Sequence, residues 1–330
     1  MGEYIISLDP GKHSVKAVGK KAEDTTDSIK KVNFRTKMYD LNDGYIERCG
    51  NSYSISFNDS NIIIGDQGID KDDNYETSKT NELHRYASYT AITQYLEPGE
   101  NDNFVNLVLA CPLSVLKVAE AKEEYKQFIK GTEPIHINVN DQEYSFEIKN
   151  ILLKAEDSGI LYLQPEIFQN KEVALIGFGG LNMNFSLYKN GSCRVVDRFT
   201  EEFGSIKLIN YIAEDLTDYK KGNIVSYDEA ERALEVGYIM NNEERDEKSI
   251  EVINFSKNRF FTDAKKIITR RGFKLDKIEA AAFVGGTSIH LVETIRKHFK
   301  NPFIPQKPDS QWATAEGLYK VAFAKYGKMS

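Results

Sequence analysis

A strand, a glycine-bearing turn and a second strand occur twice in the chain, about half its length apart. Residues 173–191 read VALIGFGGLNMNFSLYKNG, and residues 4–20 read YIISLDPGKHSVKAVGK. An offset of 168 residues aligns the two copies: Asp9 with Gly177, Gly11 with Gly179, Ser14 with Asn182 and Lys16 with Asn184. Because each copy opens one half of the chain, the repeat predicts two related α/β domains that face each other across a ligand.

Glycines in such turns let backbone N–H groups approach an anion, because no side chain intervenes. A third unit, EAAAFVGGTSIHLVETIRKHF at residues 279–299, predicts a buried strand, a turn at Gly285 and Gly286, and one amphipathic helix. Thr287 and Ser288 follow this turn, at the helix end that favours phosphate. Three such units in one chain indicate a phosphate-bearing ligand.

The charge balance excludes several classes of partner. The chain has 43 Lys and Arg against 50 Asp and Glu, a net charge of −7, which opposes direct contact with nucleic acid or an acidic membrane. The densest basic cluster, KKIITRRGFK at residues 265–274, has the spacing of a solvated helix face. No apolar run reaches the roughly 18 residues of a membrane helix, and no secretion signal is present, so we expect a cytoplasmic protein.

The ordered motifs resemble the superfamily of actin, the sugar kinases and the heat-shock chaperone ATPases. LDPGKHSVK (8–16) is similar to the first phosphate loop of that superfamily, IGFGGLN (176–182) to the second, and FVGGTS (283–288) to its adenosine motif. LKAEDSGILYL (153–163) resembles the first interdomain connection, and QWATAEGLYKVAF (311–323) resembles the closing helix. NLVLACPLSVLK (106–117), which follows YETSKTNELHRYASYTAI (75–92), most resembles the bacterial ParM-type actins that segregate plasmids.

This resemblance implies an α/β fold of two related RNase H-like, actin-like domains facing a nucleotide cleft, each with an inserted subdomain. The first domain is expected to comprise residues 1–156 and 311–330, with a small insertion at about 33–95. The second is expected to comprise residues 157–310, with a helical insertion at about 205–262.

The resemblance also implies ATP or GTP and Mg²⁺ as cofactors. Asp9 is then expected to hold the magnesium ion through water, Lys16 to reach the phosphates, and Glu156 to orient or activate the attacking water. The other expected nucleotide contacts come from the three turns: Gly11, Lys12, Ser14, Gly179, Gly180, Asn182, Gly285, Gly286, Thr287 and Ser288. Considered singly, a turn-forming Asp-Pro-Gly, a surface lysine and a helix-capping acid remain open as alternatives.

The second phosphate loop departs from the family pattern. The family usually places an aspartate where this chain has Gly177. Asn182 and Asn184 lie nearby in the sequence, but an amide cannot accept a proton as a carboxylate does. We therefore expect nucleotide binding with slow hydrolysis.

The implied function is a nucleotide-dependent filament protein. ATP binding would drive head-to-tail polymerisation, hydrolysis would drive disassembly, and a ParR-like DNA-binding adaptor would connect the filament to plasmid DNA. Two alternatives remain open: a small-molecule kinase acting on a sugar or an acid, and an ATP-dependent binding module that does not polymerise.

Four local features are also predicted. We expect a helix from about Thr80 to Tyr95, and a hairpin whose type I′ turn at Asn190-Gly191 leads into a strand at residues 192–199. The widely spaced Cys49, Cys111 and Cys193 are expected to be reduced core thiols. Trp312 is expected to pack the last helix onto the first domain.

Overall fold

The structure is a computed structural model that describes residues 2–24, 28–69, 80–132, 134–305 and 309–327. The chain divides into two compact units, unit 1 with residues 1–164 and 312–330 and unit 2 with residues 165–311. Residues 75–79 of the stretch that resembles the ParM-type actins lie outside the described residues.

Unit 1 contains a nine-stranded mixed sheet in the order β3-β2-β1-β7-β9-β8-β5-β6-β4. Its strands are β1 (Gly2–Pro10), β2 (Ser14–Lys21), β3 (Lys30–Arg35), β4 (Met38–Asp40), β5 (Ser52–Phe57), β6 (Ser60–Gly65), β7 (Asn103–Cys111), β8 (Ile135–Val139) and β9 (Gln142–Ala155). β1, β7 and β9 run parallel to one another, whereas the remaining neighbours are antiparallel. Parallel strands bring their carboxyl ends to one edge of the sheet, where ligands usually bind.

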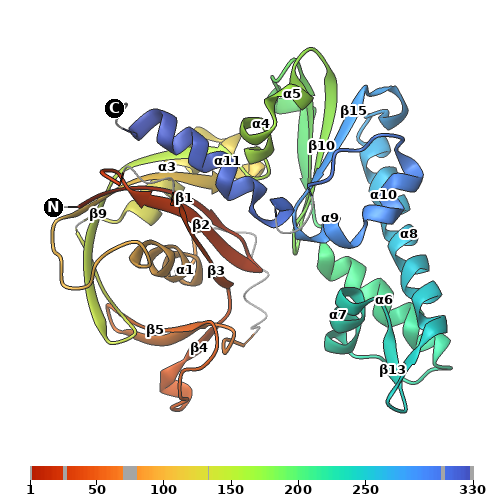
Figure 1. Ribbon diagram of the computed structural model, residues 1–330, viewed down its shortest axis with the longest axis horizontal. Helices are drawn as coiled ribbons and strands as arrows, with labels where there is room; N and C mark the ends of the chain where they lie inside the picture. Colours follow the sequence, from red (N-terminus) through yellow and green to blue (C-terminus); the bar gives the residue numbers. More distant parts are fainter. Residues whose placement is uncertain (1, 25–27, 70–79, 133, 306–308, 328–330) are drawn as a thin grey trace. The chain divides into compact units, whose positions relative to one another are not determined.

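In the described part of unit 1, this sheet is accompanied by the helices α1 (Glu82–Thr93), α2 (Leu113–Leu116), α3 (Ala119–Lys130), α4 (Gly159–Leu163) and α11 (Asp309–Tyr326). The sheet curls around α1, as Figure 1 shows, and the predicted helix at 80–95 is confirmed within two residues. Asn81 caps α1 by accepting a hydrogen bond from the backbone N–H of His84. Tyr89 and Ile92 of α1 are buried in the core of unit 1 with aliphatic side chains of the strands.

α11 belongs to a second cluster of unit 1. Its Leu318 and Ala322 pack with Ile5 and Val18 of the central strands, and Trp312 packs half-buried against the same cluster, as predicted. α4 and α11 approach closely at Gly159 and Gly317. Only glycine permits this approach, because a Cβ atom at either position would overlap the backbone of the other helix. The C-terminal helix is thus fixed directly beside the end of β9.

Unit 2 contains a four-stranded sheet in the order β12-β11-β10-β15. Its strands are β10 (Glu172–Phe178), β11 (Met183–Lys189), β12 (Arg198–Glu201) and β15 (Ala280–Val284). The order and directions repeat those of β3-β2-β1-β7 in unit 1, with two antiparallel pairs followed by one parallel pair. The sequence repeat is therefore also a repeat of topology.

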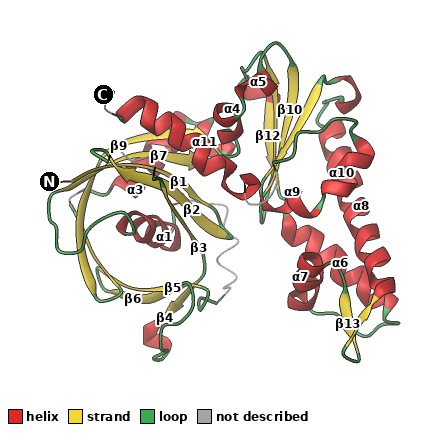
Figure 2. Cartoon of the chain, viewed as in Figure 1, coloured by secondary structure: helices red, strands yellow, loops and turns green. Residues whose placement is uncertain are grey.

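The helices of unit 2 are α5 (Pro165–Phe168), α6 (Ser205–Tyr219), α7 (Tyr227–Val236), α8 (Glu247–Arg270), α9 (Gly286–His290) and α10 (Val292–His298). Between α7 and α8 lies a small hairpin of β13 (Ile239–Asn241) and β14 (Glu244–Asp246). The segment between β12 and β15 is mostly helical, as predicted (Figure 2). Its apolar face packs on the sheet, since Ile212 of α6 and Phe260 of α8 are buried in one cluster with Phe178 of β10.

The strand expected at residues 192–199 is present only from Arg198 onward, so most of that expectation is wrong. The type I′ turn is present, with φ of 52° at Asn190 and 72° at Gly191. A 3-10 turn at Val195–Asp197 then interrupts the hairpin, and β12 starts only at Arg198. The cause is local, because the guanidinium of Arg194 donates two hydrogen bonds to the carboxylate of Asp197 and closes this turn.

Two further expectations need correction. The single helix expected after Gly286 is divided into α9 and α10 by Leu291, which is fully buried and has φ of −105° and ψ of 3°. All three cysteines are free, but only Cys111 is buried; Cys49 is exposed and Cys193 is half-buried. Among the described residues, no helix is long and apolar enough to cross a membrane.

Candidate functional site

The first glycine turn joins β1 to β2 and places Asp9 opposite Lys16. The backbone N–H of Gly11 donates to the carbonyl of Asp9 at 3.0 Å, and a Cβ atom on Gly11 would lie only 2.7 Å from the carbonyl oxygen of Ser14. Glycine is therefore required at this position by the tightness of the turn. The Lys16 ammonium donates to the Ser14 hydroxyl at 3.1 Å, which keeps the cation beside the turn.

Thr36 supports this turn and was not found by the sequence analysis. Its hydroxyl donates to the carbonyl of Gly11 at 2.8 Å, and its backbone N–H donates to the carbonyl of His13 at 3.0 Å. The residue is buried, with 3% of its surface exposed. It follows β3, 25 residues from Gly11, so that only the strand pairing brings it to the turn.

Asp9 and Glu156 lie at the same edge of the sheet in unit 1. Asp9 is near the end of β1, and Glu156 directly follows β9, with β7 between these two strands. The backbone N–H of Glu156 donates to the carbonyl of Cys111 at the end of β7, at 3.0 Å. Neighbouring strands are about 4.8 Å apart, so two strand spacings separate the backbones of the two acids by roughly 10 Å.

The phenol of Tyr125 in α3 interacts electrostatically with the carboxylates of both Asp9 and Glu156. Burial raises the pKa of this phenol well above its usual value, and electrostatic interactions with Cys111, Glu156 and Asp9 raise it further. Its hydroxyl is 3.3 Å from Nε2 of His84, a second buried side chain. A hydrogen-bonded pair of buried rings therefore lies close to the two acids.

The second glycine turn joins β10 to β11 with the register of the first. Gly177 lies opposite Asn184, as Asp9 lies opposite Lys16, so the offset of 168 residues holds in the backbone. Gly177 carries no side chain, and the buried Asn184 accepts a hydrogen bond from the Thr200 hydroxyl at 2.8 Å through its amide oxygen. The acid–lysine pair of the first hairpin is thus replaced by a glycine and an amide.

The carbonyl groups of the second turn are bonded within unit 2. The carbonyl of Gly179 accepts from the N–H of Ser205 at 2.9 Å, and that of Gly180 accepts from the N–H of Ile206 at 3.1 Å. Gly204 makes this contact with α6 possible, because a Cβ atom there would overlap the carbonyl of Gly180. The sequence analysis did not assign Gly204; its position before an apolar helix was the available signal.

The third turn packs against the second. Gly285 has φ of 89°, and a Cβ atom on it would overlap the carbonyl oxygen of Phe178. The Thr287 hydroxyl donates to the carbonyl of Gly179 at 3.2 Å, and the Ser288 hydroxyl donates to the carbonyl of Val284 at 2.6 Å. Gly286 differs, because a Cβ atom on it would meet no other atom within 4 Å.

The structure therefore groups the expected site residues in two sets. Unit 1 brings together the first turn and Glu156, and unit 2 brings together the second and third turns. Their roles in nucleotide binding and catalysis stay predictions. Among the described residues, no group of three or more His, Cys, Asp or Glu is placed to hold a metal ion directly. An ion held mostly through water, with one carboxylate beside it, fits this donor set.

Comparisons with known proteins agree with this architecture. The family model for the N-terminal domain of actin-like proteins matches residues 7–159. A comparison with curated proteins finds no significant match. Among solved structures, the Alp12 filament chain is 49% identical to this chain and matches with a TM-score of 0.72, covering 99% of this chain and 100% of its own.

Two more distant structures share the fold. The non-polymerisable quadruple mutant of pCBH ParM is 17% identical with a TM-score of 0.73, covering 98% of this chain and 99% of its own. The archaeal actin homologue Ta0583 in complex with ADP is 15% identical with a TM-score of 0.72, covering 98% of this chain and 100% of its own. With repeated α/β units, a matching family domain and a relative of 49% identity over the full length, this chain belongs to the actin-like proteins.

Proposed function

We propose that this protein is a nucleotide-dependent, filament-forming actin-like ATPase of the cytoplasm. The observation that carries the proposal is the full-length similarity, at 49% identity, to a chain solved as a filament. In this proposal, the repeated hairpins bind the nucleotide. Each provides a tight glycine turn at the end of parallel strands, where anions and nucleotides commonly bind.

In this proposal, the glycine turns and Lys16 bind ATP or GTP through its phosphates. Lys16 is held beside the first turn by the Ser14 hydroxyl, so its charge is already directed to that turn. Asp9 would hold a Mg²⁺ ion through its water ligands, and the ion would neutralise part of the phosphate charge. Support for a nucleotide comes from the fold of Ta0583, which was solved with ADP.

Glu156 holds the attacking water and accepts its proton in the proposed hydrolysis. Its backbone is fixed by the hydrogen bond to Cys111 at the same sheet edge as Asp9. Gly177 removes the second carboxylate that relatives usually carry, so hydrolysis proceeds slowly with one acid. Filaments would then persist after assembly.

We further propose that the filament segregates plasmid DNA through a ParR-like adaptor. The net charge of −7 favours an adaptor over direct contact between the filament and DNA. The alternatives are a small-molecule kinase on the same scaffold and a non-polymerising binding module. Neither explains the full-length similarity to a filament chain as directly.

Sedimentation of the purified full chain tests the proposal. We expect the protein to pellet after addition of MgATP or MgGTP without any sugar, and to show filaments by electron microscopy. A Lys16→Met variant is the control, since it removes the phosphate-binding charge without altering the turn backbone. A chain that stays monomeric with nucleotide, and turns over ATP only when a sugar is added, would instead be a kinase.

A further inference from the structure

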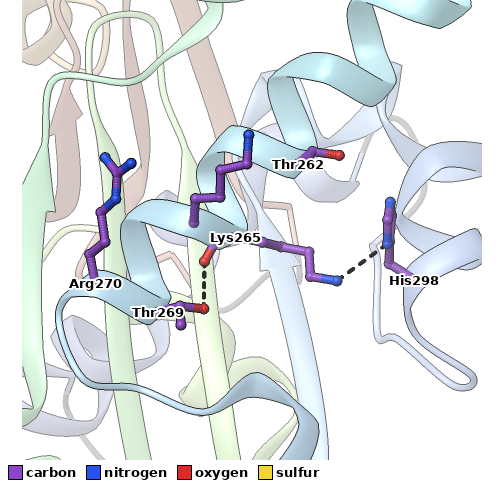
Figure 3. A pocket seen from close by; sticks show the side chains of 6 residues that line it. Thr262, Lys265, Thr269, Arg270 and His298 are labelled. Carbon is purple, nitrogen blue, oxygen red and sulfur yellow. Dashed lines mark hydrogen bonds between the residues drawn. The ribbon is translucent and has the colours of Figure 1, made fainter.

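A basic hollow lies on unit 2, between the C-terminal half of α8 and the end of α10 (Figure 3). It has a volume of about 380 Å³ and is lined by Thr262, Lys265, Lys266, Thr269, Arg270 and His298. The ammonium of Lys265 points to His298 and lies 3.3 Å from its Nδ1. Aliphatic lysine stems form much of such a wall while the charged ends stay at its rim.

The positive charge of the hollow is only partly neutralised within unit 2. Lys266 pairs with Asp263 at 2.8 Å, whereas no ion pair is recorded for Lys265 or Arg270 in the described part of the chain. Partial burial lowers the pKa of His298, and the charges of Lys265 and Lys297 lower it further. The imidazole thus experiences a local excess of positive charge.

An acidic edge lies on unit 1. It consists of Glu97, Glu100 and Asp102 in the loop between α1 and β7, with Asp141 in the β8–β9 turn and Glu143 at the start of β9, and all five residues are exposed. The backbone N–H of Gly99 donates to the carbonyl of Glu143 at 2.9 Å, which brings the two segments together.

The negative charge of this edge is likewise not neutralised by ion pairs within the described residues. Within the described residues, no ion pair is recorded for any of its five carboxylates. The pKa of Tyr4 is raised by burial and then by the charges of Glu100 and Glu97. The acidic edge therefore has an unbalanced negative potential, as the basic hollow has a positive one.

We infer that the basic hollow of one copy receives the acidic edge of the next copy in the filament. Chains with a net charge of −7 repel one another, and local patches of opposite sign offset this repulsion and direct which surfaces meet. The two patches lie on different units and are different surfaces, which makes the contact heterologous and able to propagate along a fibre. The inference rests on the proposed filament function.

Charge reversal with reciprocal mixing tests the contact. Variant A carries Lys265→Glu and Arg270→Glu in the hollow, and variant B carries Glu97→Lys and Glu100→Lys at the edge. Each variant alone places like charges in every contact, and we expect its critical concentration for pelleting with nucleotide to rise about tenfold or more. In an equimolar mixture every A–B contact is again complementary, so the mixture is expected to assemble near the parent's critical concentration.

The matched control replaces two exposed lysines of unit 2 outside the hollow, Lys248→Glu with Lys171→Glu, and so changes the net charge as variant A does. It should assemble like the parent. Nucleotide affinity and thermal midpoints of A and B show that both variants are folded. The inference is wrong if either variant assembles like the parent, if the control fails equally, or if mixing restores nothing.

Failure of the filament proposal gives a different result. If the parent itself does not pellet with nucleotide, the filament proposal fails. The A–B mixture is then examined by sedimentation velocity at low ionic strength, where association of A with B beyond that of either alone supports the contact. Two species that remain monomeric in the mixture overturn it.

Discussion

Gly285 and Gly286 are neighbours with different environments. A substitution at Gly285 is expected to lower stability, whereas one at Gly286 is expected to weaken nucleotide binding. Gly285→Ala forces a side chain into a left-handed conformation against the carbonyl of Phe178, which should cost about 1–3 kcal/mol of stability. A Cβ atom at Gly286 lies more than 4 Å from any atom outside its own turn, so Gly286→Val should preserve most of the thermal midpoint while weakening nucleotide binding. Thermal unfolding and nucleotide titration of both variants check the pair; unchanged affinity in Gly286→Val would remove the adenosine assignment.

Glu156 and Gly177 determine the expected rate of hydrolysis. Glu156→Gln keeps the size of the side chain but cannot accept a proton, so the rate of phosphate release should fall by about 10²–10⁴ while assembly is retained.

Gly177 lies in extended β10, where the backbone accepts an aspartate, and Gly177→Asp should speed phosphate release and shorten filament lifetime. Phosphate release is measured on both; a Glu156→Gln protein with the parent's rate would show that the water is held elsewhere.

His298 should make stability depend on pH. Although His298 is exposed, partial desolvation and the charges of Lys265 and Lys297 lower its folded pKa from the usual 6.5, so the unfolded chain binds the proton more readily. The stability that the neutral His298 side chain contributes is therefore fully present above pH 6.5. It is lost as the pH falls from 6.5 through the folded pKa. Denaturant midpoints of the parent and His298→Asn from pH 7 to 5 measure it. The difference between the two proteins should shrink or reverse on acidification; a constant difference contradicts the assignment.

At the scale of elements, β3 supports the first glycine turn through Thr36. Thr36→Val preserves the shape of the buried side chain but removes the hydrogen bond to Gly11, leaving its carbonyl without that donor. We expect a loss of about 1–2 kcal/mol in stability and weaker nucleotide binding. Thr36→Ser retains the hydroxyl and should recover most of the affinity. Equal affinities in the Val and Ser variants would limit Thr36 to a role in core packing.

Elements with strong periodicity were predicted correctly, whereas their interruptions were not. The hairpins around both turns and the helix α1 follow from apolar alternation and glycine placement. The 3-10 turn after Cys193 depends on one Arg194–Asp197 ion pair, and the break between α9 and α10 depends on the burial of Leu291. Neither contact changes the hydrophobic pattern, so the pattern predicts an uninterrupted strand and an uninterrupted helix at these two places.

At the scale of the whole molecule, charge governs contact with DNA. With 50 acidic and 43 basic residues, and the basic hollow assigned to a second copy, the chain has little surface for phosphate backbones. We expect no tight binding of the purified protein to plasmid DNA at physiological salt. Electrophoretic mobility shifts over a range of salt check this; tight binding with a steep salt dependence would contradict it.

The sequence alone was sufficient for the repeat and for the residues that flank each turn, because strand periodicity and glycine spacing are local properties. The fold family came from the resemblance of the ordered motifs to a known superfamily. An offset of 168 residues in the sequence reappears unchanged in the pairing of Asp9 with Lys16 and of Gly177 with Asn184. Tertiary structure decided what surrounds those turns: Thr36 beneath Gly11, Gly204 against Gly180, and Tyr125 beside both acids. These contacts join residues far apart in the chain, so they depend on how strands pair and helices pack, which no local pattern records.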